Sequence, residues 1–106
     1  MVEYSLQLDL LFGSLADATR RDILKRVAKS EQSIRELAGH YHMTFAGIAK
    51  HIAVLEKATL IEKRRKGRQQ IISANPKAIA LSQSHLKKYQ QILADRYDQL
   101  DNLLGK

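Results

Sequence analysis

The chain has 106 residues, no cysteine and a formal net charge of +7. This length fits one domain, and the absence of cysteine excludes disulfides, thiolate metal sites and a nucleophilic thiol. No apolar run approaches the roughly 20 residues that cross a bilayer, and the N-terminus lacks a signal-peptide pattern, so we expect a single cytoplasmic domain over residues 1–106 with no membrane partner.

Two helices are predicted in the first 30 residues. Leu8, Leu11, Phe12 and Leu15 recur at intervals of three and four, which indicates a short helix with one apolar face. Asp17 can cap a second helix over residues 18–29, in which Ile23, Leu24 and Val27 form the next apolar stripe.

A pair of helices follows over residues 33–59. Ser33 and Glu36 have the spacing of a capping box, which starts a short third helix. We expect Gly39 to let the backbone leave helical geometry there, with His40, Tyr41 and His42 forming the turn. Thr44 then caps a fourth helix, whose inward face is expected to contain Phe45, Ile48, Ile52 and Leu55.

The hydrophobic period becomes strand-like after this helix. Segments 60–65 and 68–74 flank Lys66 and Gly67, and Gly67 can take the positive φ of a two-residue hairpin turn. Residues 57–68 hold six basic residues and one acidic residue, whereas residues 1–56 hold seven of each. Most of the positive charge thus lies in one short window, which is typical of a surface that binds a polyanion.

A long last helix is predicted over residues 76–104. Asn75 and Pro76 suit its N-cap and first position. Ile79, Leu86, Leu93 and Leu100 are seven residues apart, which indicates a coiled-coil seam that is imperfect at Ser82 and Arg96. The expected fold is mainly α with a β-hairpin, in the order α-α-α-α-β-β-α.

The helix pair and the hairpin each admit two interpretations. Residues 33–59 form either a helix-turn-helix that presents its second helix to a DNA major groove or an ordinary helical hairpin with a solvated face. The basic hairpin of residues 60–74 is either a ribbon that neutralises phosphates or a charged edge that prevents strand pairing. The scarcity of acidic residues in the hairpin favours DNA contact. The candidate major-groove residues are Thr44, Ala46, Gly47, Lys50 and His51; those of the hairpin are Arg64, Lys66, Gly67, Arg68 and Gln70.

Three segments resemble the ArsR-type winged helix-turn-helix repressors, in the branch without a recognised metal site. They are "LFGSLADATRRDILKRVA", "SIRELAGHYHMTFAGIAKHIAVLEKATLIEKRRKGRQQ" and "HLKKYQQILADRYDQLDNLL". Ala18, Gly47, Ala49 and Thr59 depart from residues usual in that family. Thr59 replaces a glycine, so the cap there is expected to be either strained or differently formed. The resemblance implies a homodimer whose first and last helices form the interface. We expect that interface to contain Leu8, Leu11, Phe12, Leu86, Tyr89, Leu93, Tyr97 and Leu100.

The expected function is therefore sequence-specific binding to double-stranded DNA, as a homodimeric repressor of a pseudo-palindromic operator. The alternatives are a winged-helix module that binds a protein partner and a metal-responsive repressor. No nucleophile with its base, phosphate-binding glycine loop or paired catalytic carboxylates appear, so we expect neither an enzyme nor a cofactor. His40, His42 and His85 lack a ligand pattern, so no metal site is expected. The sequence identifies no small-molecule inducer.

Overall fold

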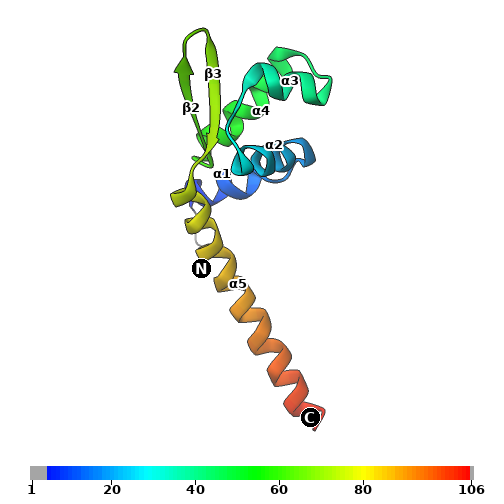
Figure 1. The fold of residues 1–106 in the computed structure, drawn as a ribbon. Coiled ribbons are helices and arrows are strands. Elements are labelled where there is room, and N and C mark those ends of the chain that lie inside the picture. Colours follow the sequence, from blue (N-terminus) through cyan, green and yellow to red (C-terminus); the bar gives the residue numbers. More distant parts are fainter. Residues whose placement is uncertain (1–4, 106) are drawn as a thin grey trace. The chain divides into compact units, whose positions relative to one another are not determined.

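A computed structural model of the chain describes residues 5–105 (Figure 1). The predicted order of elements is confirmed, with one short strand added before the third helix. The chain divides into two compact units, one ending at Pro76 and one beginning at Lys77. The elements are α1 (Leu6–Ser14), α2 (Ala18–Lys29), β1 (Gln32–Ser33), α3 (Ile34–Tyr41), α4 (Phe45–Lys57), β2 (Ile61–Lys66), β3 (Gln69–Ala74) and α5 (Pro76–Leu103).

Side-chain caps begin the first four helices. Asp17 accepts a hydrogen bond from the amide of Arg20 at α2, and Thr44 accepts one from the amide of Gly47 at α4. At α3, Ser33 and Glu36 exchange two hydrogen bonds of 3.1 Å, so the predicted capping box is complete. Ser5 caps α1. Since each cap satisfies amides that have no partner within the helix, these local signals fix where the helices start.

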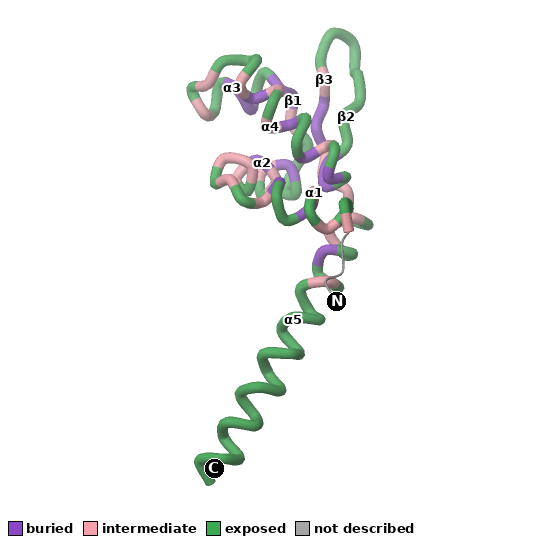
Figure 2. Tube along the Cα trace, turned by 180° about the vertical axis from the view of Figure 1, so that it is seen from behind, coloured by how far each residue is buried: buried purple, intermediate pink, exposed green. Residues whose placement is uncertain are grey.

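The core of the first unit lies where the helices meet the sheet (Figure 2). β3 is the central strand, between β1 and β2, and both pairings are antiparallel. β1 was not predicted; it pairs Gln32 with Ile72 and Ser33 with Ile71. The largest fully buried apolar side chains come from α2, α3, α4, β2, β3 and the residue before β2; they are Ile23, Leu37, Ile48, Ile52, Leu55, Leu60, Ile61 and Ile72.

The C-terminus of α4 is a Schellman motif built on Thr59. The Thr59 amide donates to the carbonyl of Glu56, and the Leu60 amide donates to the carbonyl of Leu55. Thr59 has a φ of +64°, and the side chains of Leu55 and Leu60 are buried. A β-branched residue in the left-handed region is sterically strained, so of the two expected outcomes the strained cap is confirmed, at the position usual for glycine.

Two turns differ from the predictions. Gly39 lies inside α3, which continues to Tyr41, and His42 takes the left-handed conformation with a φ of +53°. The hairpin turn consists of Gly67 and Arg68, because Lys66 and Gln69 form the last cross-strand pair. Gly67 has a φ of +63° and Arg68 does not share the positive sign, the pattern of a type II′ turn.

In the second unit, α5 presents a row of exposed apolar side chains. Leu86, Tyr89, Leu93 and Leu100 are all exposed, as the predicted seam requires. Tyr97 and Leu104 extend the row at helical intervals of three and four. We call these six residues the α5 stripe. None of the described helices combines the length and apolar character needed to span a membrane.

Candidate nucleic-acid interface

One exposed face of α4 consists of three alanines and a lysine. Ala46, Ala49, Lys50 and Ala53 are spaced i, i+3, i+4 and i+7, so they share one helix face. Ala46, Lys50 and Ala53 are exposed, and Ala49 is partly exposed. We call these four residues the reading face. Among these four residues only Lys50 has a polar side chain, and the exposed Lys57, four residues after Ala53, continues the same face at the end of α4.

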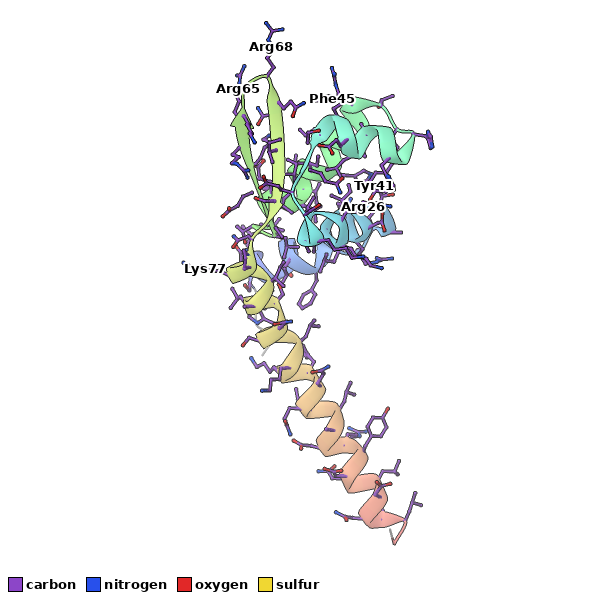
Figure 3. All side chains as sticks on the ribbon, viewed as in Figure 1. Arg26, Tyr41, Phe45, Arg65, Arg68 and Lys77 are labelled. Carbon is purple, nitrogen blue, oxygen red and sulfur yellow. The ribbon has the colours of Figure 1, made fainter. Side chains whose placement is uncertain are left out.

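Phe45 was predicted to face the core, and this prediction is wrong. The structure leaves 58% of the residue exposed, whereas Ile48, Ile52 and Leu55 are buried as expected. Phe45 is the first residue of α4, and the helix interior packs on the core without covering it (Figure 3). An aromatic ring thus lies at the end of the helix that carries the reading face.

Gly47 serves the packing at the start of α4. A Cβ atom at this position would lie 3.2 Å from Oγ1 of Thr44 and 3.3 Å from Cε of Met43. Both contacts are tight, and the first involves the capping hydroxyl. A larger residue at position 47 would therefore require the Thr44 hydroxyl and the end of the Met43 side chain to shift by a few tenths of an ångström, and Gly47 is only partly exposed.

His51 lies at the edge of α4 that faces α2. Its Nδ1 is 3.4 Å from Nη1 of Arg20 and 3.9 Å from Oδ2 of Asp17, and 21% of its side chain is exposed. Arg20 also donates to the carbonyl oxygens of Ser14, at 2.6 Å, and Gly13, at 3.2 Å. The Arg20 amide, which donates to the Asp17 carboxylate, is the main cause of the lowered pKa of that carboxyl. His51 consequently links α4 to the α1–α2 junction and is not part of the reading face.

Two cations at the base of the hairpin already have carboxylate partners. Nη2 of Arg64 is 2.7 Å from Oε1 of Glu31, and Nζ of Lys63 is 3.7 Å from Oε1 of Glu56. The hydrogen bond from Arg64 lowers the pKa of Glu31 and the same contact raises the pKa of Arg64. Arg64, which the sequence analysis placed among the DNA contacts, is therefore held by Glu31 in this structure.

The cations at the tip of the hairpin are placed differently. Arg65, Lys66 and Arg68 are exposed, and within residues 5–105 none of them forms an ion pair with a carboxylate. Nε of Arg65 donates to the carbonyl of Gly67 at 3.1 Å, which orders the tip. Figure 3 shows Arg65 and Arg68 at the end of the hairpin. We call these three residues the tip cations; Arg65 is the one that the predicted site omitted.

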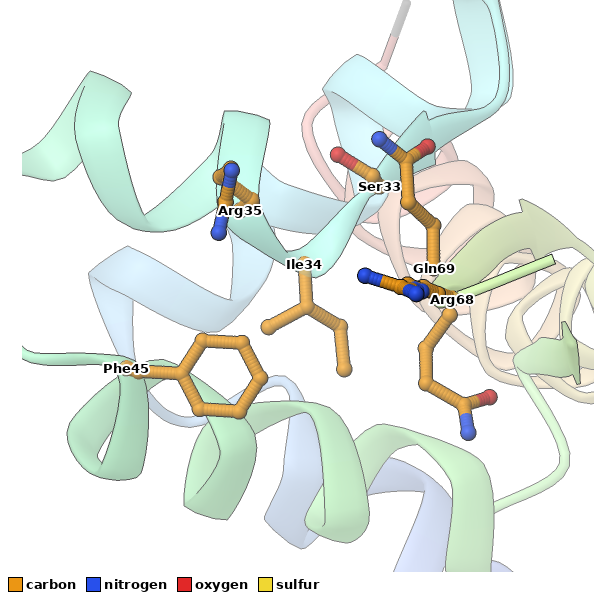
Figure 4. Close-up of a pocket in the computed structure, with 7 residues that line it drawn as sticks. Ser33, Ile34, Arg35, Phe45, Arg68 and Gln69 are labelled. Atoms are coloured by element: carbon orange, nitrogen blue, oxygen red, sulfur yellow. The ribbon is translucent and has the colours of Figure 1, made fainter. Parts of the chain in front are cut away.

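A hollow of about 340 Å³ separates the hairpin from the helix pair (Figure 4). Phe45 and Ile34 provide its apolar lining. Arg35 and Arg68 add positive charge, and Figure 4 shows them on different elements, with Ile34 between the ring of Phe45 and Arg68. Its remaining lining residues are Ser33, Gln69 and the predicted contact Gln70. The hollow therefore combines apolar surface with cations beside the start of α4.

The end of α3 is fastened to α2 by three side chains. Tyr41 donates a hydrogen bond of 2.5 Å to Oδ2 of Asp22, and Nε of Arg26 donates to both partners. The hydrogen bond from Tyr41 is the main cause of the lowered pKa of Asp22, while burial and that bond raise the pKa of Tyr41 to about 12. This contact holds the turn between α3 and α4 in place.

The predicted interface residues are mostly available to a partner. Phe12 is exposed and Leu8 is partly exposed on α1, whereas Leu11 is buried in the protein core. The five predicted residues of α5 all lie in the α5 stripe, and the exposed Leu104 continues their row. Among residues 5–105, no three His, Asp or Glu side chains are grouped so that they could hold a metal ion.

A helix pair with an exposed second helix, followed by a hairpin with a cationic tip, defines a winged helix-turn-helix protein that binds DNA. Residues 17–63 match the family described as bacterial regulatory protein, arsR family. The HTH-type transcriptional regulator YuzN of Bacillus subtilis is 35% identical over 74 residues, which cover 63% of this chain and 80% of YuzN. The chain belongs to the ArsR family of winged helix-turn-helix transcriptional regulators, and it is a regulator and not an enzyme.

Solved structures agree with this assignment. The ArsR family transcriptional regulator RHA00566 superposes with a TM-score of 0.77 at 29% identity, covering 89% of this chain and 97% of that one. A solution structure of the homodimeric winged helix-turn-helix DNA-binding domain Mb0332 from Mycobacterium bovis has a TM-score of 0.65 at 22% identity, covering 90% and 91%. The second comparison shows a shared fold.

Proposed function

We propose that the protein is a homodimeric repressor that occludes a promoter by binding a pseudo-palindromic operator. The observation that carries this proposal is the exposed reading face next to a hairpin whose tip cations have no carboxylate partner among the described residues. Charge alone would suffice for a hairpin whose role is to prevent strand pairing at the sheet edge. That role does not explain why the tip cations lie next to the exposed helix of a helix-turn-helix.

The reading face and the tip cations have different proposed roles in DNA recognition. Base edges in a major groove are read by the N-terminal part of the second helix, so Thr44, Ala46 and Lys50 are the proposed contacts, with the Gly47 amide donating to the Thr44 cap. The tip cations contact phosphates, which supplies affinity with little sequence information. Gly67 turns the ribbon. His51 orients α4 through Arg20 and Asp17.

The α5 stripe supports a dimer. Five large apolar side chains in one row of α5, continued by Leu104 directly after the helix, expose apolar surface that a second copy of the helix would cover. We propose that Phe12 and Leu8 of α1 complete the interface, and that Leu11 supports them from the core. The relative Mb0332, which shares the fold, is homodimeric.

We propose that such a dimer represses transcription by occluding the promoter. Two reading faces related by a two-fold axis meet half-sites about 10–10.5 base pairs apart, so the dimer covers a stretch of promoter that RNA polymerase would otherwise occupy. A regulator of this kind acts in the bacterial cytoplasm, where the DNA is.

Selection of bound fragments from bacterial genomic DNA tests the proposal. The enriched fragments should contain an inverted repeat with that spacing, and insertion of five base pairs between its halves should abolish tight binding. Lys50→Ala should lower the preference for the repeat over random DNA, whereas the matched control Lys88→Ala on α5 should leave it unchanged. Failure to enrich any sequence at moderate salt would instead favour a module that binds a protein partner.

A metal titration tests the alternative that the protein is a metal-responsive repressor. Zinc or nickel should leave the affinity of the purified dimer for the selected repeat unchanged. A metal-dependent loss of binding would show that the protein is a metal sensor.

A further inference from the structure

The reading face is mostly apolar. Ala46, Ala49 and Ala53 present only methyl groups, and Lys50 is the single cation. Every base pair offers hydrogen-bonding groups in the major groove, but only thymine offers an apolar group, its C5 methyl. A polar base edge pressed against alanine would lose water without gaining a partner, whereas the thymine methyl loses nothing of this kind.

Phe45 adds apolar surface at the hairpin side of this helix end. Its ring is largely exposed, and it lines the hollow together with Ile34 (Figure 4). Arg35 and Arg68, which line the same hollow, can meet phosphates on either side of a base that contacts the ring. Burial of an exposed aromatic side chain against a methyl group is favourable, so contact with a thymine methyl group would stabilise the complex through Phe45.

We propose that the protein selects its operator mainly through thymine methyl groups, which contact Ala46, Ala49 and Ala53 of the reading face and the ring of Phe45. Lys50 supplies one hydrogen-bonded contact, to O6 and N7 of a guanine. Each half-site thus consists of thymines around one guanine. This inference rests on the proposed function, because it names the sequence class that the same helix reads.

Replacing thymine by uracil in the selected operator tests the inference, since uracil differs only in lacking the methyl group. Each contacted thymine should contribute about fourfold to the affinity, the effect of burying one methyl group. At the same positions, a cytosine–guanine pair should weaken binding and 5-methylcytosine should recover part of the loss. Fluorescence anisotropy with the full-length dimer measures all three duplexes.

Two results would overturn the inference. If uracil at every half-site position changes the affinity by less than twofold while the operator is still preferred over scrambled DNA, the methyl groups are not read and the proposed function stands. If no DNA sequence is preferred, the proposed function fails and the inference fails with it.

The variant Phe45→Ala tests whether the ring of Phe45 contacts a thymine methyl group. In Phe45→Ala, the uracil penalty should disappear at one thymine per half-site and persist at the others. Leu81→Ala, which shortens an exposed apolar side chain of α5, should leave every penalty unchanged. An unchanged penalty pattern in Phe45→Ala would remove that residue from the readout.

Discussion

The tip of the hairpin gives the most quantitative prediction. Arg65 and Arg68 are exposed and form no ion pair with a carboxylate in residues 5–105, whereas Arg64 is 2.7 Å from Glu31. The double variant Arg65→Ala/Arg68→Ala should therefore lose phosphate contacts, and Arg64→Ala should lose few or none. Because the three side chains are all exposed, neither variant should unfold the protein.

The size of the effect follows from counting contacts. Each neutralised phosphate contributes about −0.9 to the slope of log affinity against log salt concentration. Two arginines per protomer, and thus four per dimer, should make the slope less steep by about 3.6. Between 50 and 200 mM salt, the wild-type affinity should then fall about 150-fold more than that of the double variant.

The assay is fluorescence anisotropy with operator and scrambled duplexes at several salt concentrations. The double variant should weaken both complexes by similar factors, because phosphate contacts carry little sequence information. A double variant with the wild-type slope on both duplexes would refute the reasoning and make the hairpin an edge guard. A slope change as large in Arg64→Ala would show that its ion pair with Glu31 does not persist on DNA.

Three further predictions concern assembly and stability. Leu93→Asp puts a charge into the α5 stripe and should raise the dimer dissociation constant more than about hundredfold in sedimentation equilibrium, whereas Ile92→Asp, outside the stripe, should not; equal effects would contradict the stripe. Thr59→Gly relieves the left-handed strain and should raise the melting temperature by about 4–8 °C; a decrease would mean that Thr59 is not strained. Tyr41→Phe should lower the free energy of unfolding in urea at neutral pH by about 1 kcal/mol. Since the folded pKa of Tyr41 is raised from 10.0 to about 12, the phenol stabilises the fold below pH 10, and this difference should shrink as the pH rises toward 12; a constant difference would contradict it.

The sequence predicted those features that depend on neighbouring residues. The caps at Asp17, Ser33 and Thr44 form as expected, because a side chain and the amide two or three residues later decide them. The positive φ of Gly67 was likewise predictable, although the turn lies one residue further along. The exposure of five residues of the α5 stripe followed from helical spacing alone, and Leu104 continues their row.

The features that were missed depend on distant contacts. α3 continues through Gly39 because Leu37 and Ala38 are buried and Tyr41 is bound to Asp22, so packing overrides the preference of glycine. β1 forms only when β3 lies beside it, and two residues give no strand signal. The exposure of Phe45 arises from its place at the end of a packed helix, which periodicity does not encode.

The sequence also could not show which cations of the hairpin have carboxylate partners, because these contacts join distant residues. Six basic residues within twelve positions look equivalent in the sequence, but strand pairing brings Arg64 to Glu31, 33 residues earlier in the chain. The polar link from His51 to Arg20 spans 31 residues. Local sequence therefore predicted a cationic hairpin but could not predict which of its cations have carboxylate partners.

The central claim is that this protein prefers a particular DNA sequence. The most direct test compares the affinity of the wild-type dimer for the selected inverted repeat with its affinity for a scrambled duplex of equal length and composition at the same salt concentration. We expect a preference of about a thousandfold or more for the inverted repeat. Equal affinity for the two duplexes would contradict it.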